Sequence, residues 1–277
     1  MKRILTVQDI SCVGKCSLTV ALPVLAAMGL ETAVLPTAVL STHTGFPNPS
    51  FRDLTDGIAQ ISAHWQQVGV SFDGVCTGYL GSREQVAQIL ALAEQFCGDG
   101  SMLFVDPVMG DNGKLYAGID AGLPENMAQL CARADVIMPN ITEACFLTQT
   151  PYRETCDEAY IHTLLERLAA LGCKVALITG VSFSAGTTGV AGYEKTGKTF
   201  FRYTQEKLPQ SYHGTGDIFS SVCAGAMLLG RDWRDAIRLA ADYTAECIRQ
   251  TGLQDRDKRY GVCFEKAIGY LLKKLEQ

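Results

Sequence analysis

Four consecutive residues, Gly214 to Asp217, combine a backbone that can bind an anion with a carboxylate. Gly214, Thr215 and Gly216 can present successive N–H groups, and the small apolar residues 218–229 predict the helix that they begin. Asp217 then lies in the first turn, where its carboxylate can accept a hydroxyl proton while the amides hold a phosphoryl group. The alternative is an acidic residue favoured there by the helix dipole alone.

Two further strings supply carboxylates and small residues. Residues Asp106 to Asp111 spell Asp-Pro-Val-Met-Gly-Asp, and residues Pro139 to Glu143 spell Pro-Asn-Ile-Thr-Glu. Mg²⁺ prefers hard oxygen ligands and often takes one or two carboxylates, so Asp106 and Glu143 are candidate metal ligands. Phosphoryl transfer requires a base, an anion site and neutralisation of charge on the moving group. The three strings together therefore indicate phosphoryl transfer.

Short β-rich segments alternate with segments of helical periodicity along most of the chain. Predicted strands cover 4–7, 32–39, 74–77, 102–105, 136–138 and 175–178, and predicted helices cover 17–28, 52–68, 83–96, 124–134 and 158–171. This alternation predicts an α/β fold with a mostly parallel central sheet and helices on both faces. Segments 186–193 and 198–203 flank a tight turn and predict an antiparallel hairpin at one edge.

The chain closes with two or three predicted helices, of which 233–248 has one clear apolar face. Neither a linker-like segment nor an internal repeat is evident, so we expect a single domain over residues 1–277.

The loops that follow the predicted strands contain nearly all of the candidate chemical residues. In open sheets of this class, ligands bind beyond the carboxyl ends of the strands. Each of these residues taken alone is more often a helix cap or a turn residue. They indicate a site because all of them follow strands at the same edge of the predicted sheet. These loops hold Asp9 and Ser11, Ser41 to Thr44, Gly78 to Ser82, Asp106 to Asp111, Asn140 to Glu143, and Thr179 to Ser182.

One motif has to be rejected. Residues Gly192 to Thr199 match the phosphate-binding loop pattern G-x-x-x-x-G-K-T letter for letter. That loop must follow a strand and open a helix, whereas residues 199–204 are aromatic and β-branched and predict a strand. We therefore expect a hairpin turn over Glu194 to Gly197.

Composition excludes several classes of function. The net charge of −5 and the scattered Lys and Arg residues give no surface for nucleic acid. The N-terminal apolar core is too short for a signal peptide, and no window approaches a membrane span, so we expect a cytoplasmic protein. The eleven cysteines are odd in number, and several, such as Cys76, Cys131 and Cys223, lie in apolar stretches. Buried free thiols are expected, and Cys12 and Cys16 lack a partner pair at zinc-ligand spacing.

In these motifs the chain resembles the ribokinase-like superfamily and, within it, the pyridoxal (vitamin B6) kinases, from Ile4 to about Leu229. Besides the three strings, the resemblance rests on Ser-Thr-His-Thr at Ser41 to Thr44 and Gly-Tyr-Leu-Gly-Ser at Gly78 to Ser82. It implies a three-layer α/β/α fold and ATP-dependent phosphorylation of the 5′-hydroxymethyl group of pyridoxal, pyridoxine or pyridoxamine. It also implies Mg²⁺, a possible monovalent cation and a homodimer.

The resemblance assigns roles to individual residues. It makes Asp217 the base, with Gly214, Thr215 and Gly216 as the anion hole, and it makes Asp106 and Glu143 the metal ligands. It places Asp111, Asn140 and Thr179 at the nucleotide. On the substrate side it implies ring stacking by Tyr79, contact of Thr44 with ring substituents, and a contribution from Ser41 and His43.

One departure concerns the first strand. The family's typical Gln-Ser-His is replaced by Gln8-Asp9-Ile10-Ser11, so either Asp9 or Ser11 occupies the place of a ring-contacting serine. An Asp9 beside the ring would favour the protonated pyridine, whereas an Asp9 that caps the following helix would leave the ring to Ser11. This choice bears on which vitamer is preferred.

Two other functions were weighed. A hydroxymethylpyrimidine kinase of the same superfamily usually has a Gly-Gly-Ala-Gly turn after the first strand and often a Cys in the anion hole, whereas this chain has Ser11 to Gly14 and Asp217. A catalytically silent nucleotide-binding regulator has no need for an intact base and two metal acids.

A polar loop from Asp111 to Ile119, bracketed by Gly113 and Gly118, is a candidate flap that closes over the site.

Overall fold

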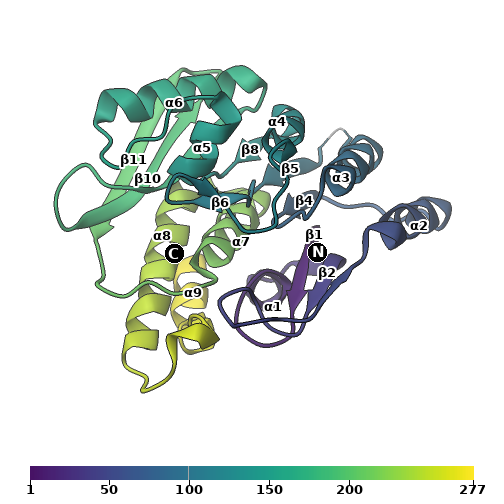
Figure 1. The fold of residues 1–277 in the computed structure, drawn as a ribbon, viewed down its shortest axis with the longest axis horizontal. Helices are drawn as coiled ribbons and strands as arrows, with labels where there is room; N and C mark the ends of the chain where they lie inside the picture. Colours follow the sequence, from purple (N-terminus) through teal and green to yellow (C-terminus); the bar gives the residue numbers. More distant parts are fainter. Residues whose placement is uncertain (99) are drawn as a thin grey trace. The chain divides into compact units, whose positions relative to one another are not determined.

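The structure is a computed structural model that describes residues 1–98 and 100–277 (Figure 1). The chain divides into two compact units. The first combines Met1–Gly78 with Leu208–Gln277, and the second is Tyr79–Lys207.

The sheet of the first unit has the strand order β3-β2-β1-β4. Its strands are β1 (Arg3–Ser11), β2 (Glu31–Leu40), β3 (Phe51–Asp53) and β4 (Gly74–Thr77). β1 runs parallel to β2 and β4, and β3 is antiparallel to β2. Ile4 to Gln8 are all buried, as expected of a parallel strand covered on both faces.

The pairing of β1 with β2 contains an irregularity at Asp9. Gln8 pairs with Pro36 and Ile10 pairs with Val39, so two residues of β2 lie opposite Asp9. Pro36 lacks the N–H that a regular ladder of hydrogen bonds needs. An extra residue in one strand also changes the direction of the neighbouring side chains.

The helices of the first unit come from both ends of the chain. They are α1 (Leu18–Ala27), α2 (Thr55–Gln67), α7 (Thr215–Leu228), α8 (Trp233–Gly252) and α9 (Ile268–Leu275), with short 3₁₀ turns at Lys258–Tyr260 and Phe264–Lys266. α7 packs against both α1 and α8, and its residues Ile218 to Ala226 are all buried (Figure 1). Small residues make this close packing possible, since a side chain at Gly225 would meet Met28 at 2.8 Å.

The sheet of the second unit has the order β5-β8-β9-β10-β11. Its strands are β5 (Met102–Val105), β8 (Val136–Ile137), β9 (Val175–Val181), β10 (Thr187–Glu194) and β11 (Thr199–Glu206), and its helices are α3 (Arg83–Phe96), α4 (Leu123–Arg133), α5 (Ile141–Thr148) and α6 (Glu158–Leu171). The first three strands are parallel, and β10 and β11 are antiparallel. β6 (Gly110–Asp111) and β7 (Lys114–Leu115) form a separate hairpin.

Most predicted elements are confirmed, and the differences have local causes. The helix expected from residue 52 begins at Thr55, because Phe51 to Asp53 pair with β2 and the Asp53 carboxylate accepts the Thr55 N–H at 2.7 Å. α5 begins inside the string that we expected to be a loop. All eleven cysteines are free thiols, and Cys76, Cys131 and Cys223 are buried as expected. In the described part of the chain, no helix has the length and apolar character needed to cross a bilayer.

The hairpin reading of Gly192 to Thr199 is confirmed. β10 and β11 pair on either side of the turn, and the Glu194 carboxylate accepts the N–H groups of Thr196 and Gly197, both at 2.7 Å. Lys198 has a φ of +50° and leads directly into β11. The string therefore ends a strand and begins another.

A substitution in this turn tests its lack of a nucleotide role. Lys198→Ala should leave the KM for ATP within about twofold of wild type, because a phosphate-binding lysine must sit on a loop that opens a helix. Steady-state kinetics with varied ATP measures this value. A KM raised tenfold or more, with lost turnover, would restore the phosphate-binding loop.

Candidate active site

The N-terminus of α7 carries the predicted anion site. Gly214, the residue before the helix, has a φ of +85°, and a Cβ there would lie 2.2 Å from the backbone oxygen of Lys15. Only glycine fits this position. The N–H groups of the first helical turn have no acceptor within the helix, and Gly216 among them is exposed. The backbone here can therefore bind an anion.

Asp217 is half-buried in the first turn of α7. Its carboxylate accepts hydrogen bonds from the backbone N–H of Ser17 and from the Cys16 thiol. Burial raises the pKa of Asp217 above its usual range, and these two hydrogen bonds oppose part of that rise. A carboxylate held in this way is a fixed proton acceptor beside the anion site.

Asp9 is 5% exposed, and its two oxygens accept hydrogen bonds from serine hydroxyls. Ser11 Oγ donates at 3.1 Å to one oxygen, and Ser17 Oγ donates to the other at a short distance. Burial raises the pKa of Asp9, the Ser17 bond lowers it, and the negative charge of Asp217 raises it again. Asp9 and Ser11 are thus bonded to each other, and Asp9 is tied to the residue that precedes α1.

The loop from Ser41 to Thr44, which we expected to contact substrate, contains a histidine with both ring nitrogens hydrogen-bonded. His43 is 3% exposed, its Nδ1 accepts the Gly45 N–H at 3.0 Å, and its Nε2 donates to the Arg259 backbone oxygen at 2.6 Å. Ser41 and Thr44 are exposed, although Ser41 Oγ accepts the Ser50 N–H. The hydrogen bonds of His43 therefore hold the loop in shape. Of the two exposed residues, Ser41 bonds to the Ser50 backbone and Thr44 presents its side chain to solvent.

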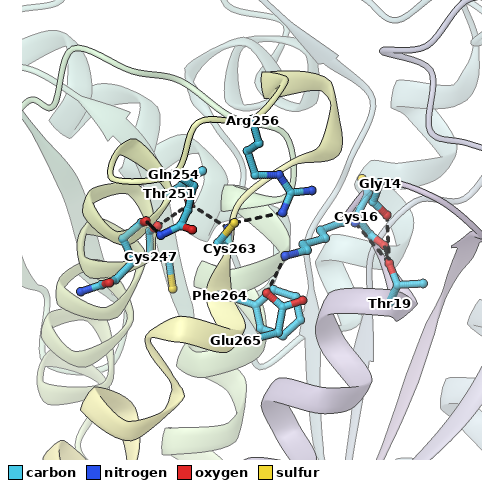
Figure 2. Close-up of polar contacts among 12 residues, drawn as sticks. Gly14, Cys16, Thr19, Cys247, Thr251, Gln254, Arg256, Cys263, Phe264 and Glu265 are labelled. Atoms are coloured by element: carbon cyan, nitrogen blue, oxygen red, sulfur yellow. Dashed lines mark hydrogen bonds and ion pairs between the residues drawn. The ribbon is translucent and has the colours of Figure 1, made fainter.

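Residues 256–265, here called the C-terminal segment, hold the turn before α1 in place (Figure 2). The Lys15 ammonium pairs with Glu265 at 2.5 Å and lies 5.5 Å above the Phe264 ring. A Cβ at Gly261 would come within 3.0 Å of the Lys15 backbone oxygen. The segment is anchored in turn by the Cys263 N–H, which donates to Thr251 Oγ1 at 2.7 Å.

Neither this segment nor Ser17 is among the site residues that the sequence predicts. Their contacts join residues far apart in the chain, such as Lys15 with Glu265, and residue types alone do not reveal such pairings. The one available signal was the polar Gly14-Lys15-Cys16-Ser17 stretch between the first strand and its helix.

The second unit assembles the predicted acidic strings around the start of α5. Asn140 and Glu143 form a capping box, in which Asn140 Oδ1 accepts the Glu143 N–H at 3.0 Å and Glu143 Oε2 accepts the Asn140 N–H at 2.9 Å. Glu143 Oε1 also accepts the Met109 N–H at 3.1 Å, and Asn140 Nδ2 donates to the Gly110 oxygen at 2.8 Å. These bonds join α5 to the Asp106–Asp111 string.

Negative charge is concentrated here. Burial raises the pKa of Glu143, its backbone hydrogen bonds lower it, and the charge of Asp111 raises it further. Asp106 is also buried, and the charges of Glu143 and Asp106 both act on the Cys131 thiol, whose pKa is raised mainly by burial. Asp106 and Glu143 supply the hard carboxylate oxygens that suit a hydrated divalent cation held through water. Among the described residues, no group of three or more His, Cys, Asp or Glu side chains gathers as a metal cage.

The remaining predicted residues of this unit lie as follows. Thr179 is half-buried next to Asn140, and its N–H donates to the Pro139 oxygen at 2.9 Å. Tyr79 is half-buried, with its hydroxyl over Gly81. Asp111 is exposed at the end of β6.

The expected flap is a short hairpin. Its turn residues Asn112 and Gly113 have φ values of +51° and +75°, and the Gly113 N–H donates to Thr142 Oγ1 at 2.9 Å. This bond ties the turn to α5. Closure of residues 111–119 stays a prediction, which hydrogen exchange with and without ATP and vitamer would test.

A scan against family models places residues 26–260 in the phosphomethylpyrimidine kinase family. The chain belongs to this family of the ribokinase-like kinases. Among solved structures, the pyridoxal kinase from Lactobacillus plantarum is 37% identical, with a TM-score of 0.92 over 99% of this chain and 97% of that one. A family member from Bacteroides thetaiotaomicron, solved with pyridoxal, is 38% identical, with a TM-score of 0.94 over 98% of this chain and 95% of that one.

A curated relative agrees with these structures. The pyridoxal kinase PdxY of Rubrobacter xylanophilus is 27% identical over 256 residues, which are 90% of this chain and 87% of the relative. The expected three-layer α/β fold with a mostly parallel sheet is confirmed, and so is the expected kinase activity.

Loss of the Asn140 side chain should destabilise the protein more than loss of an ordinary helix cap. Asn140→Ala removes both the α5 cap and the bond to Gly110, so it should lower the free energy of unfolding by about 2 kcal/mol. The matched control is Asp157→Ala, which removes a single cap bond to the Tyr160 N–H and should cost about 1 kcal/mol. Urea unfolding measures both, and equal losses would show that the Gly110 bond contributes nothing.

Proposed function

We propose that the protein transfers the γ-phosphoryl group of ATP to the 5′-hydroxymethyl group of a vitamin B6 vitamer, forming the 5′-phosphate. The observation that carries this proposal is the fixed Asp217 carboxylate beside the open N–H groups of the α7 N-terminus. The relative from Bacteroides thetaiotaomicron, solved with pyridoxal, supports the substrate class.

The chemistry assigned to Asp217 is proton acceptance. As the hydroxymethyl oxygen bonds to the γ-phosphorus and the bond to ADP breaks, the hydroxyl proton passes to the Asp217 carboxylate. A raised pKa makes the carboxylate a better acceptor near neutral pH. The amides of Gly214, Thr215 and Gly216 offset the charge on the moving group.

The other parts of the proposal concern binding. Asp111, Asn140 and Thr179 would contact the nucleotide, and Tyr79, Thr44, Ser41 and either Asp9 or Ser11 would contact the vitamer. Asp106 and Glu143 would hold a hydrated Mg²⁺, which neutralises phosphate charge when bound. We extend the proposal to a cytoplasmic homodimer that uses a monovalent cation.

A second candidate has one observation in its favour. The matching family model is described as phosphomethylpyrimidine kinase. The alternative enzyme of the same superfamily, hydroxymethylpyrimidine kinase, also acts on a small heteroaromatic alcohol. One assay separates the candidates: ATP-dependent phosphorylation of pyridoxal, pyridoxine, pyridoxamine and hydroxymethylpyrimidine, compared by kcat/KM. We expect the three vitamers to lead. Preference for hydroxymethylpyrimidine would favour the second candidate, and no turnover on any substrate would favour a silent regulator.

The role of Asp217 predicts a large kinetic effect. Asp217→Asn should lower kcat by about 10² to 10⁴-fold with little change in the KM for ATP, because the proton acceptor is lost and the amides remain. The matched control is Asp232→Asn, which changes the capping residue of α8 and should leave kcat unchanged. Near-normal turnover of Asp217→Asn would remove Asp217 from the mechanism.

A further inference from the structure

Ser17 connects two carboxylates that come from different elements. Its hydroxyl donates to Asp9 at the end of β1, and its backbone N–H donates to Asp217 at the start of α7. The preceding residue, Cys16, donates its thiol to Asp217 as well. Two of the groups that hydrogen-bond to the Asp217 carboxylate therefore come from one two-residue turn.

The backbone of this turn is held in a conformation that residues other than glycine rarely adopt. Ser17 has φ +52° and ψ −129°, and it is 4% exposed. Its hydroxyl does not cap α1, although Ser17 is the residue before that helix. The hydroxyl is instead bonded to Asp9, and a backbone bridge joins Ser17 to Ile10. A strained conformation of this kind persists only where its surroundings fix it.

Asp9 is placed to fix it. In the strand register Asp9 lies opposite the extra residue of β2, and the carboxylate oxygen that does not accept from Ser17 accepts from Ser11. A carboxylate that accepts two hydroxyl bonds while 5% exposed is rigid and cannot turn to another partner without leaving a buried charge unpaired.

From this geometry we propose that Asp9 is a positioning residue for the proton acceptor: by holding Ser17, it directs the Ser17 N–H and the Cys16 thiol onto Asp217. The inference rests on the proposed function for its kinetic consequence. It assigns Asp9 a role through Ser17 and leaves ring contact to other residues.

The titratable groups around this cluster are few. Asp9 comes from β1, Cys16 from the turn and Asp217 from α7, and the charges of the two carboxylates both raise the pKa of the Cys16 thiol, after burial as the main cause. Lys15 is paired with Glu265, and the His213 ring packs on His43, which contributes with burial to a lowered pKa of His213. The pH response of the cluster therefore belongs to Asp9, Cys16 and Asp217.

Two Asp9 variants separate geometry from charge. Asp9→Ser is too short to reach Ser17, so kcat should fall about 10-fold to 100-fold while both KM values stay within about twofold. Asp9→Asn keeps an acceptor for Ser17 but removes the charge, so the acidic limb of the kcat profile should move to lower pH because Asp217 loses a repelling neighbour. The matched control is Asp73→Asn, whose carboxylate accepts the Arg3 N–H at the other end of β1.

A double-mutant cycle tests whether Asp9 acts through Ser17. Ser17→Ala should lower kcat as much as Asp9→Ser does, and the double variant should be no slower than either one. Additive losses, or a vitamer KM raised tenfold with kcat kept, would overturn the proposal.

A second measurement needs no substrate and so does not depend on the proposed function. Alkylation of Cys16 by iodoacetamide, followed by peptide mass spectrometry, should be at least about tenfold faster in Asp9→Ser than in Asp9→Asn, because both variants remove the charge of Asp9 and only Asp9→Ser releases the turn that holds the thiol at Asp217. Cys156 in the same samples is the internal control. Equal Cys16 rates in the two variants would overturn the proposal even if the wild-type protein phosphorylates no vitamer.

Discussion

The structure around the N-terminus of α7 depends on the close approach of the Gly14–Ser17 turn to Gly214. Lys15 presents its backbone oxygen to Gly214 at a distance that no side chain at that position would permit. The same turn meets Gly261 on the C-terminal segment, and Gly14 itself lies against the His43 ring. Three glycines thus allow three segments that are distant in sequence, at His43, Gly214 and Gly261, to meet at one backbone turn.

The two units treat their carboxylates in the same way. In each, a carboxylate with a proposed role in the reaction accepts hydrogen bonds from backbone N–H groups. Ser17 donates to Asp217, and Asn140 and Met109 donate to Glu143. Backbone donors cannot rotate away as side chains can, so the carboxylates are oriented before any ligand arrives. Burial raises their pKa values, and these bonds keep the charged forms accessible.

Much of this arrangement was predictable from the sequence, for reasons that are local. Periodicity and turn residues predict the alternation of strands and helices, the edge hairpin and the helix after Gly214. The residue types in the strings around Asp106, Glu143 and Asp217 predict phosphoryl transfer. α5 was missed because its eight residues are too short for a clear helical period. The orientation of Asp9 could not be predicted, because it depends on the extra residue in β2 and on a serine whose backbone conformation the sequence does not announce.

The division of the chain has a consequence for how the protein is made. Residues 79–207 form one continuous unit, whereas the first unit needs both Met1–Gly78 and Leu208–Gln277. During synthesis the continuous unit can fold while the N-terminal strands still lack α7, α8 and the segment that anchors Lys15. The first unit is therefore the last part to mature, and until then its apolar strands need protection from other nascent chains.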